Sequence, residues 1–172
     1  DAPIQREGPT GTWEPNNYDG QFRGLMPLRE AVATSRNIPA VLMAERLGYE
    51  TLQGFLHQIG LKQALALPST ALGAFEASPL RLAEAYSIFV NGGALPKTRI
   101  IDQVHQPEHT GSQADLVANW ELLLESSPSS EHQVSARAAA MARSVLESVL
   151  TIGSGKAAKR YGVSDGSWLV CE

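Results

Sequence analysis

The chain has 172 residues, of which 43% are hydrophobic and 19% are charged. This length and composition predict one domain with a packed core and exclude wholesale disorder. The net charge is −4 and the sequence has no block of Lys or Arg, which argues against nucleic acid or an anionic membrane as the main partner. Cys171 is the only cysteine, so an internal disulfide and a cysteine-rich zinc site are excluded.

The sequence carries no recognisable targeting or membrane segment. No apolar run reaches the roughly 18 residues of a membrane helix. The N-terminus has neither the basic region nor the apolar region of a signal peptide, and it does not begin with Met. We therefore expect a mature product or a piece of a longer protein.

The N-terminal quarter predicts a loop followed by two helices. Residues 1–24 are rich in Pro, Gly and Asn, which is typical of a loop with short extended pieces. A helix is predicted from Pro27, and Asn37-Ile38-Pro39 would interrupt it because a residue before proline disfavours the α region. A second helix would run from Pro39 to Leu47 and end at Gly48. Three aromatic side chains are expected to pin the loop onto the core: Trp13, Tyr18 and Phe22.

Two further helices have clear start and stop signals. Thr51 would cap a helix that ends at Gly60. Ser78-Pro79 is a strong helix start, and Asn91-Gly92-Gly93 would end that helix. Its apolar residues predict an inward face: Leu82, Ala83, Tyr86, Phe89 and Val90.

The C-terminal part predicts a strand and two or three helical segments. Residues 99–104 are short and β-branched, which favours a strand, whereas apolar spacing predicts a helix over 116–124. Ser135 would cap a long helix reaching Val149, and a short helical turn would end at Tyr161. The predicted fold class is mostly α with minor β.

Three motif-like sequences lack the context that their chemistry requires. The G-x-S-x-G around Ser164 has only six residues after it, and every histidine precedes it. The Gly153–Lys156 sequence lacks the first glycine of a phosphate loop. Pro107 separates His105 from His109 and would break a helix that placed both on one face. We expect no metal site and no cofactor.

The informative segment is Ser35-Arg36-Asn37, at the expected helix interruption. A serine and an asparagine two residues apart on a non-helical corner can face one cleft. The hydroxyl can relay a proton, and the carboxamide can hold a substrate amide through a donor and an acceptor. S-x-N is common by itself, and helix capping is the more frequent reason for such residues.

The surroundings of this segment resemble the transpeptidase domain of class A (bifunctional) penicillin-binding proteins. The resemblance is continuous over about the first 105 residues and resumes near residue 134, whereas residues 106–133 follow no family pattern. We therefore expect residues 1–172 to be a partial transpeptidase-like domain with a divergent, insert-like segment at 106–133. The segments that carry the resemblance are Trp13–Asp19, Gly24–Val32, Ser35–Val41, Leu72–Leu80, Ala83–Tyr86, Asn91–Gly93, Ile100–Val104 and Met141–Tyr161.

The resemblance implies acyl transfer at the cell envelope. In the family, the serine of an S-x-x-K motif attacks a D-alanyl-D-alanine stem peptide or a β-lactam and forms an acyl-enzyme. By the same resemblance, Ser35 would relay a proton and Asn37 would bind the substrate amide. The implied location is the periplasmic face, and the implied parent activity is peptidoglycan cross-linking.

Two family motifs are absent from the sequence. No serine is followed three residues later by Lys, and Lys-Thr-Gly does not occur. In the family, S-x-x-K precedes the stretch that matches residues 1–24, so the chain would begin after it. The implied fold is the helical part of a domain that also has a five-stranded sheet. Apolar faces meant for that sheet would be exposed, or covered by self-association or a complementing fragment.

Three functional hypotheses remain open at this point. The first is a fragment or degenerate form of the transpeptidase domain, without a nucleophile of its own. The second is a non-enzymatic helical module that binds a peptide or a β-lactam reversibly. The third is a β-lactamase-like serine hydrolase that uses Ser35 or Ser164 with Lys62, Lys97 or Lys156 as the base.

Overall fold

A computed structural model describes residues 1–8, 11–107, 120–125 and 129–162. These residues form α-helices, two 3₁₀ helices and three two-stranded antiparallel sheets, in which β1 pairs with β2, β3 with β6 and β4 with β5. The elements in chain order are β1 (Arg6–Gly8), β2 (Gly11–Trp13), α1 (Leu28–Ala33), α2 (Asn37–Leu47), α3 (Tyr49–Gln58), η1 (Pro68–Leu72), α4 (Pro79–Ser87), β3 (Ala94–Pro96), β4 (Gln103–Pro107), β5 (Trp120–Glu125), β6 (Ser130–His132), α5 (Ala136–Thr151) and η2 (Ser154–Tyr161). None of the described helices is long and apolar enough to cross a bilayer.

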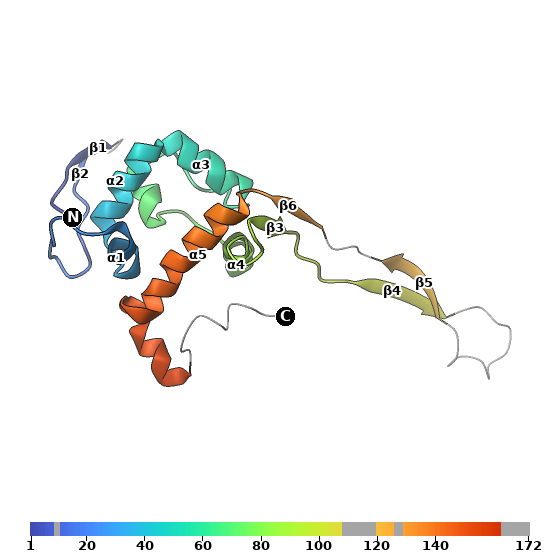
Figure 1. The fold of residues 1–172 in the computed structure, drawn as a ribbon. Coiled ribbons are helices and arrows are strands. Elements are labelled where there is room, and N and C mark those ends of the chain that lie inside the picture. The colour runs from blue at the N-terminus through green and yellow to red at the C-terminus, as the bar shows by residue number, and fades with distance from the viewer. Residues whose placement is uncertain (9–10, 108–119, 126–128, 163–172) are drawn as a thin grey trace.

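The helices form one body, from which the β4–β5 ribbon projects (Figure 1). The long helix α5 runs through this body and packs against α1 near the N-terminal loop. Arg29 of α1 donates to the Ser148 hydroxyl of α5 at 2.9 Å. Just after α5, a Cβ on Gly153 would lie 1.9 Å from the carbonyl oxygen of Ala33, so the backbone approach tolerates only glycine. These contacts fix the C-terminal end of α1.

Both predicted serine caps are confirmed. The hydroxyl of Ser78 accepts a hydrogen bond from the Arg81 amide at 3.3 Å at the start of α4. The hydroxyl of Ser135 accepts one from the Ala138 amide at 3.2 Å at the start of α5. Each serine satisfies an amide that the helix itself leaves without a partner.

The predicted interruption before Pro39 is displaced. Helix α2 already begins at Asn37, so Ile38 is helical and fully buried. Pro39 lies in the first turn, where its missing N–H would have had no intrahelical partner. The break in the chain lies at Ser35 and Arg36 instead. Similarly, α3 begins at Tyr49 rather than after Thr51.

Two predictions between residues 99 and 124 differ from the structure. The strand expected over 99–104 is present but displaced, because β4 spans Gln103–Pro107. The helix expected over 116–124 is instead the strand β5 from Trp120, and residues 116–119 lie outside the described part. Cross-strand pairing, such as Val104 opposite Leu124, outweighs the helical spacing of the leucines.

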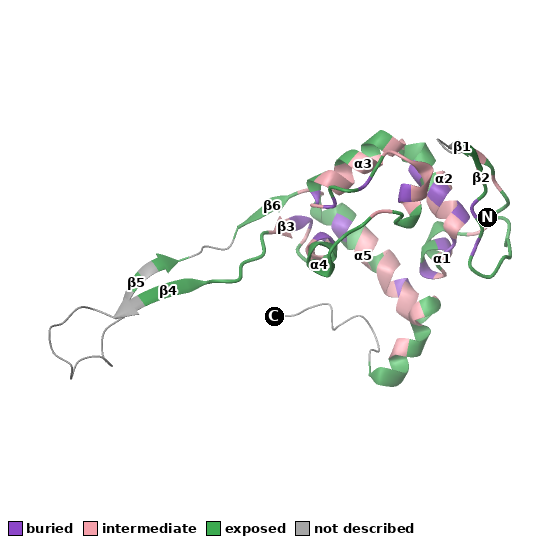
Figure 2. Cartoon of the chain, turned by 180° about the vertical axis from the view of Figure 1, so that it is seen from behind, coloured by how far each residue is buried: buried purple, intermediate pink, exposed green. Residues whose placement is uncertain are grey.

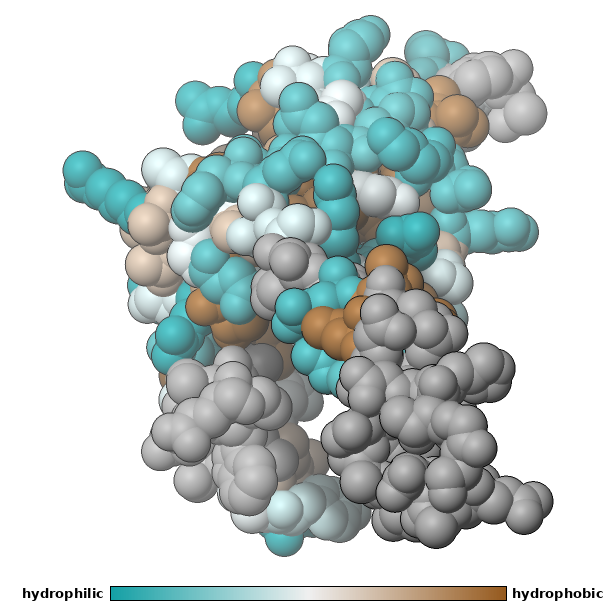
Figure 3. Space-filling view, turned by 90° about the vertical axis from the view of Figure 1, so that its right-hand side faces the viewer, coloured by the Kyte–Doolittle hydropathy of each residue, from teal (hydrophilic) through white to brown (hydrophobic). Residues whose placement is uncertain are grey.

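Buried residues gather where the helices meet (Figure 2), whereas Val104 of β4 and Leu122 and Leu124 of β5 are exposed. Ile59 and Leu61 pack with Ala85 of α4 and with Ile88, which directly follows α4. The inward face predicted for α4 is therefore rotated, and Leu82 and Tyr86 are exposed. Viewed from the ribbon side, most of the described surface is hydrophilic with separate hydrophobic patches (Figure 3).

The aromatic anchors predicted for the N-terminal loop hold only in part. Trp13 is half-buried, but Phe22 is 36% exposed and Tyr18 is fully exposed. Asn17, in contrast, is only 4% exposed. Polar contacts, rather than aromatic packing, attach this loop to the helices.

Candidate functional site

The corner between α1 and α2 is built by a Schellman motif at the end of α1. The Ser35 amide donates to the Val32 carbonyl at 3.1 Å, and the Arg36 amide donates to the Ala31 carbonyl at 2.9 Å. These two bonds satisfy carbonyls that would otherwise be unpaired at the helix end. The motif turns the chain sharply and separates the two helices by Thr34, Ser35 and Arg36.

Ser35 occupies the position of this motif that is most often glycine. Its φ is +54°, and it is the one described residue other than glycine with a positive φ. The left-handed conformation costs an L-residue roughly 1–2 kcal/mol. The side chain is exposed, and its hydroxyl makes no hydrogen bond to any described residue. The corner therefore holds a strained serine whose hydroxyl faces outward.

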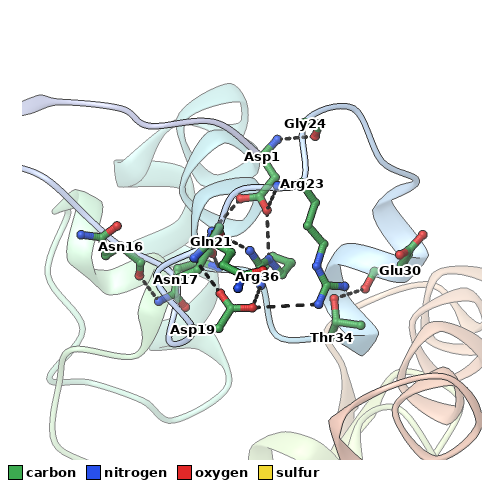
Figure 4. A network of polar contacts seen from close by, with 11 residues as sticks. Asp1, Asn16, Asn17, Asp19, Gln21, Arg23, Gly24, Glu30, Thr34 and Arg36 are labelled. Carbon is green, nitrogen blue, oxygen red and sulfur yellow. Dashed lines mark hydrogen bonds and ion pairs between the residues drawn. The ribbon is translucent and has the colours of Figure 1, made fainter.

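Arg36 lies beneath this corner with its side chain only 4% exposed. Its Nε donates to the Asp1 carboxylate at 2.9 Å, and its Nη1 donates to the Asp19 carboxylate at 2.8 Å. Its Nη2 donates to the Gln21 carbonyl. Figure 4 shows these groups converging on the guanidinium from the N-terminal loop. Two opposite charges thus compensate the burial of the cation.

The same loop holds Asn37. The Asn37 amide donates to the side-chain oxygen of Asn17 at 2.9 Å, and the Asn37 side chain donates from Nδ2 to the Asn16 carbonyl at 2.6 Å. Asn17 in turn donates to the Asp1 carboxylate at 2.9 Å and to the Gln21 carbonyl at 2.8 Å. Within the described residues, Oδ1 of Asn37 has no donor, so it is available as an acceptor.

The electrostatics of the corner favour an ionised Asp19. The hydrogen bond from Arg36 lowers the pKa of Asp19 below its ordinary 3.8, and the backbone amide of Gln21 adds to the effect. Arg23 lies 4.0 Å from the same carboxylate and lowers the pKa further. The loop and the buried guanidinium therefore remain paired at neutral pH.

Two cavities flank this network. One, of about 460 Å³, is mostly apolar and lies between the chain before α1 and helix α2, with Leu28 and Met43 in its walls. The other, of about 480 Å³, is lined by Pro3, Asn16 and Phe22 among others. Ser35 and Asn37 line neither of these two cavities.

The remaining candidate residues do not join the corner. Lys97, directly after β3, pairs with Glu131 of β6 at 3.4 Å. Lys156 lies in η2, which begins after Gly153, as expected for a helix start. His105 is exposed in β4, and Ser164 and His109 lie outside the described residues. The described part of the chain contains no cluster of three metal-ligating side chains.

Sequence reasoning missed Arg36, Asn17 and Asp19 as parts of the site. In the sequence, Arg36 is only the unspecified middle residue of S-x-N, and Asn17 and Asp19 belong to the predicted loop over residues 1–24. A signal is present, because the charged Arg36 lies two residues before the apolar Ile38 at a corner of the chain. The carboxylate partners of Arg36 could not be found from the sequence, since Asp19 and Asp1 lie 17 and 35 residues away.

A known family matches nearly the whole chain. The model of the penicillin binding protein transpeptidase domain matches residues 1–167. Penicillin-binding protein 1A of Neisseria lactamica is 32% identical over 171 residues, which cover 96% of this chain and 21% of that protein. Penicillin-binding protein 1B of Vibrio cholerae is 35% identical over 96 residues, or 54% of this chain and 12% of that protein.

A solved structure agrees with these matches. The crystal structure of penicillin-binding protein 1A from Haemophilus influenzae superposes with a TM-score of 0.76 and 25% sequence identity. The superposition covers 90% of this chain and 26% of that one. This chain thus spans about a fifth of the length of the penicillin-binding protein 1A relative from Neisseria lactamica.

Proposed function

Because the chain belongs to the penicillin-binding protein transpeptidase family, we propose that it provides the S-x-N side of a transpeptidase active site. The activity of the parent domain would be cross-linking of D-alanyl-D-alanine stem peptides in the cell envelope, with binding of β-lactams. Residues 1–172 would be a partial domain with an insert-like segment at 106–133. It would contribute mainly the helical part of the parent fold.

The proposed roles of Ser35 and Asn37 follow from their side-chain groups that have no hydrogen-bond partner among the described residues. The exposed Ser35 hydroxyl can accept and pass on a proton, and Oδ1 of Asn37 can accept a hydrogen bond from a ligand amide. The observation that carries the proposal is the strained Ser35, because a serine in place of glycine at a Schellman position costs stability and gains only its hydroxyl.

The covalent step needs a nucleophile from another segment. Neither S-x-x-K nor K-T-G occurs in these 172 residues. Exposed apolar side chains near the corner, such as Leu25 and Leu28, support docking of a complementing segment or self-association. The chain by itself would then bind ligand reversibly without being acylated.

Intact mass and NMR spectra of the chain with benzylpenicillin, and with a D-alanyl-D-alanine peptide, test the proposal. We expect no covalent adduct, and saturable shifts of the Ser35 and Asn37 amide signals with both ligands. Asn37→Ala should abolish the shifts, and Asn91→Ala, in the turn after α4, should keep them. An adduct that disappears in Ser35→Ala would overturn the proposal in favour of a nucleophilic Ser35. Drug hydrolysis without an adduct would favour the hydrolase alternative, and absent shifts would reject the binding role.

A further inference from the structure

The middle residue of the S-x-N segment has a buried, charged side chain, although its neighbours carry the groups that face outward. The Arg36 guanidinium has partners on three sides, while Ser35 and Asn37 flank it on the chain. An arginine has the planar, multiple-donor geometry that this arrangement uses, and a lysine does not. Burying a cation is costly without compensation, so the presence of Arg36 here calls for a reason.

We propose that Arg36 is a positioning residue, which holds Ser35 in its left-handed conformation and Asn37 at the start of α2. This inference rests on the proposed function for its ligand readout, but its conformational readout is independent of any ligand. Anchoring by Asp1 and Asp19 fixes the residue directly after Ser35, and so opposes relaxation of Ser35 to a negative φ.

The N-terminal loop also links Arg36 to Asn37 through the side chain of Asn17. Asn17 contacts both the Asp1 carboxylate beside Arg36 and the amide of Asn37, so the network joins Arg36 to Asn37 through two side chains. The Ser35 hydroxyl and the Asn37 carboxamide are thereby given a fixed relative orientation before ligand binds. Such preorganisation lowers the conformational cost of binding.

NMR can test the positioning role directly. A residue with positive φ has a short distance between its own amide and Hα protons, which gives a strong NOE. In Arg36→Met we expect that NOE of Ser35 to weaken and the Kd for benzylpenicillin to rise by about tenfold or more. Arg36→Lys should keep only part of the Ser35 NOE and only part of the affinity for benzylpenicillin. Arg81→Met is the control: it removes an arginine that pairs with Glu84 within α4, away from the corner, and should change neither readout.

Asp19→Asn keeps the test valid if Arg36→Met does not fold. Asp19 is partly exposed, and the variant retains the Arg36–Asp1 pair. It should weaken the Ser35 NOE and raise the Kd by less than Arg36→Met does. If Arg36→Met folds and leaves the Ser35 NOE and the Kd unchanged, the inference is overturned. If Arg36→Met does not fold, an Asp19→Asn variant with an unchanged NOE and Kd overturns it. If the parent chain binds no penicillin, the proposed function fails, and the NOE alone decides the role of Arg36.

Discussion

The side-chain oxygen of Asn17 accepts a hydrogen bond of 2.9 Å from the backbone amide of Asn37. Arg36, which precedes α2, provides no side-chain cap of its own. Asn17 therefore caps α2 from a loop twenty residues away. One carboxamide thus serves both the start of a helix and the attachment of the N-terminal loop.

Replacing Asn17 with Ala should destabilise the chain. The change leaves the Asn37 amide, the Asp1 carboxylate and the Gln21 carbonyl without this partner, and we expect a loss of roughly 1–3 kcal/mol. Urea denaturation followed by circular dichroism measures it. Asn16→Ala is the control, because Asn16 contributes its backbone carbonyl rather than its side chain. Equal stability of the two variants would contradict the cap.

At position 35, glycine should give a more stable chain than alanine if the backbone there is left-handed. Glycine adopts φ near +54° without a Cβ penalty, so we expect Ser35→Gly to be more stable than Ser35→Ala by about 1 kcal/mol. Paired urea denaturation curves give this difference. An alanine variant as stable as the glycine variant would show that the residue has a negative φ in solution.

The depressed pKa of Asp19 predicts a loss of stability in acid. Because the pKa is lower in the folded chain than its ordinary 3.8, the contribution of Asp19 is present above that value. It is lost as pH falls further, through the folded pKa. Below pH 4, the free energy of unfolding should therefore fall less steeply with decreasing pH in Asp19→Asn than in the parent chain.

The Asp19 comparison needs a carboxylate outside the network as its control. Asp102 pairs with Arg99 at 3.1 Å, but its side chain is 76% exposed. Exposed ion pairs contribute little to stability. Asp102→Asn should leave the steep acid limb of the parent chain in place, and identical curves for all three proteins would refute the role of Asp19.

Gly153→Ala should separate α1 from the end of α5. The new Cβ would meet the Ala33 carbonyl at 1.9 Å and the Val149 Cα at 2.8 Å, and backbone atoms cannot move aside cheaply. We expect a loss of about 1–3 kcal/mol or more, measured by thermal denaturation. Gly54→Ala is the control, because its Cβ would meet nothing within 4 Å in α3 and should stabilise that helix by about 0.5–1 kcal/mol. A neutral Gly153→Ala would contradict this close approach.

Helix termini with a local chemical cause were predictable from the sequence. Ser78 and Ser135 cap amides three residues ahead, and Gly48 follows α2 as predicted. Such signals operate within one turn of helix, so neighbouring residues are sufficient to predict them. The S-x-N segment was likewise found from adjacent residues, as was the family resemblance.

The tertiary structure decided the rest, because the partners are distant in the chain. Whether Trp120–Glu125 is a strand depends on pairing with Gln103–Pro107, and the leucine spacing by itself favoured a helix. The left-handed Ser35 depends on where α1 ends, and the burial of Arg36 depends on carboxylates at Asp1 and Asp19. Local sequence thus determined where helices start and which polar groups lie at the corner, whereas long-range electrostatics and backbone packing determined how those groups are held.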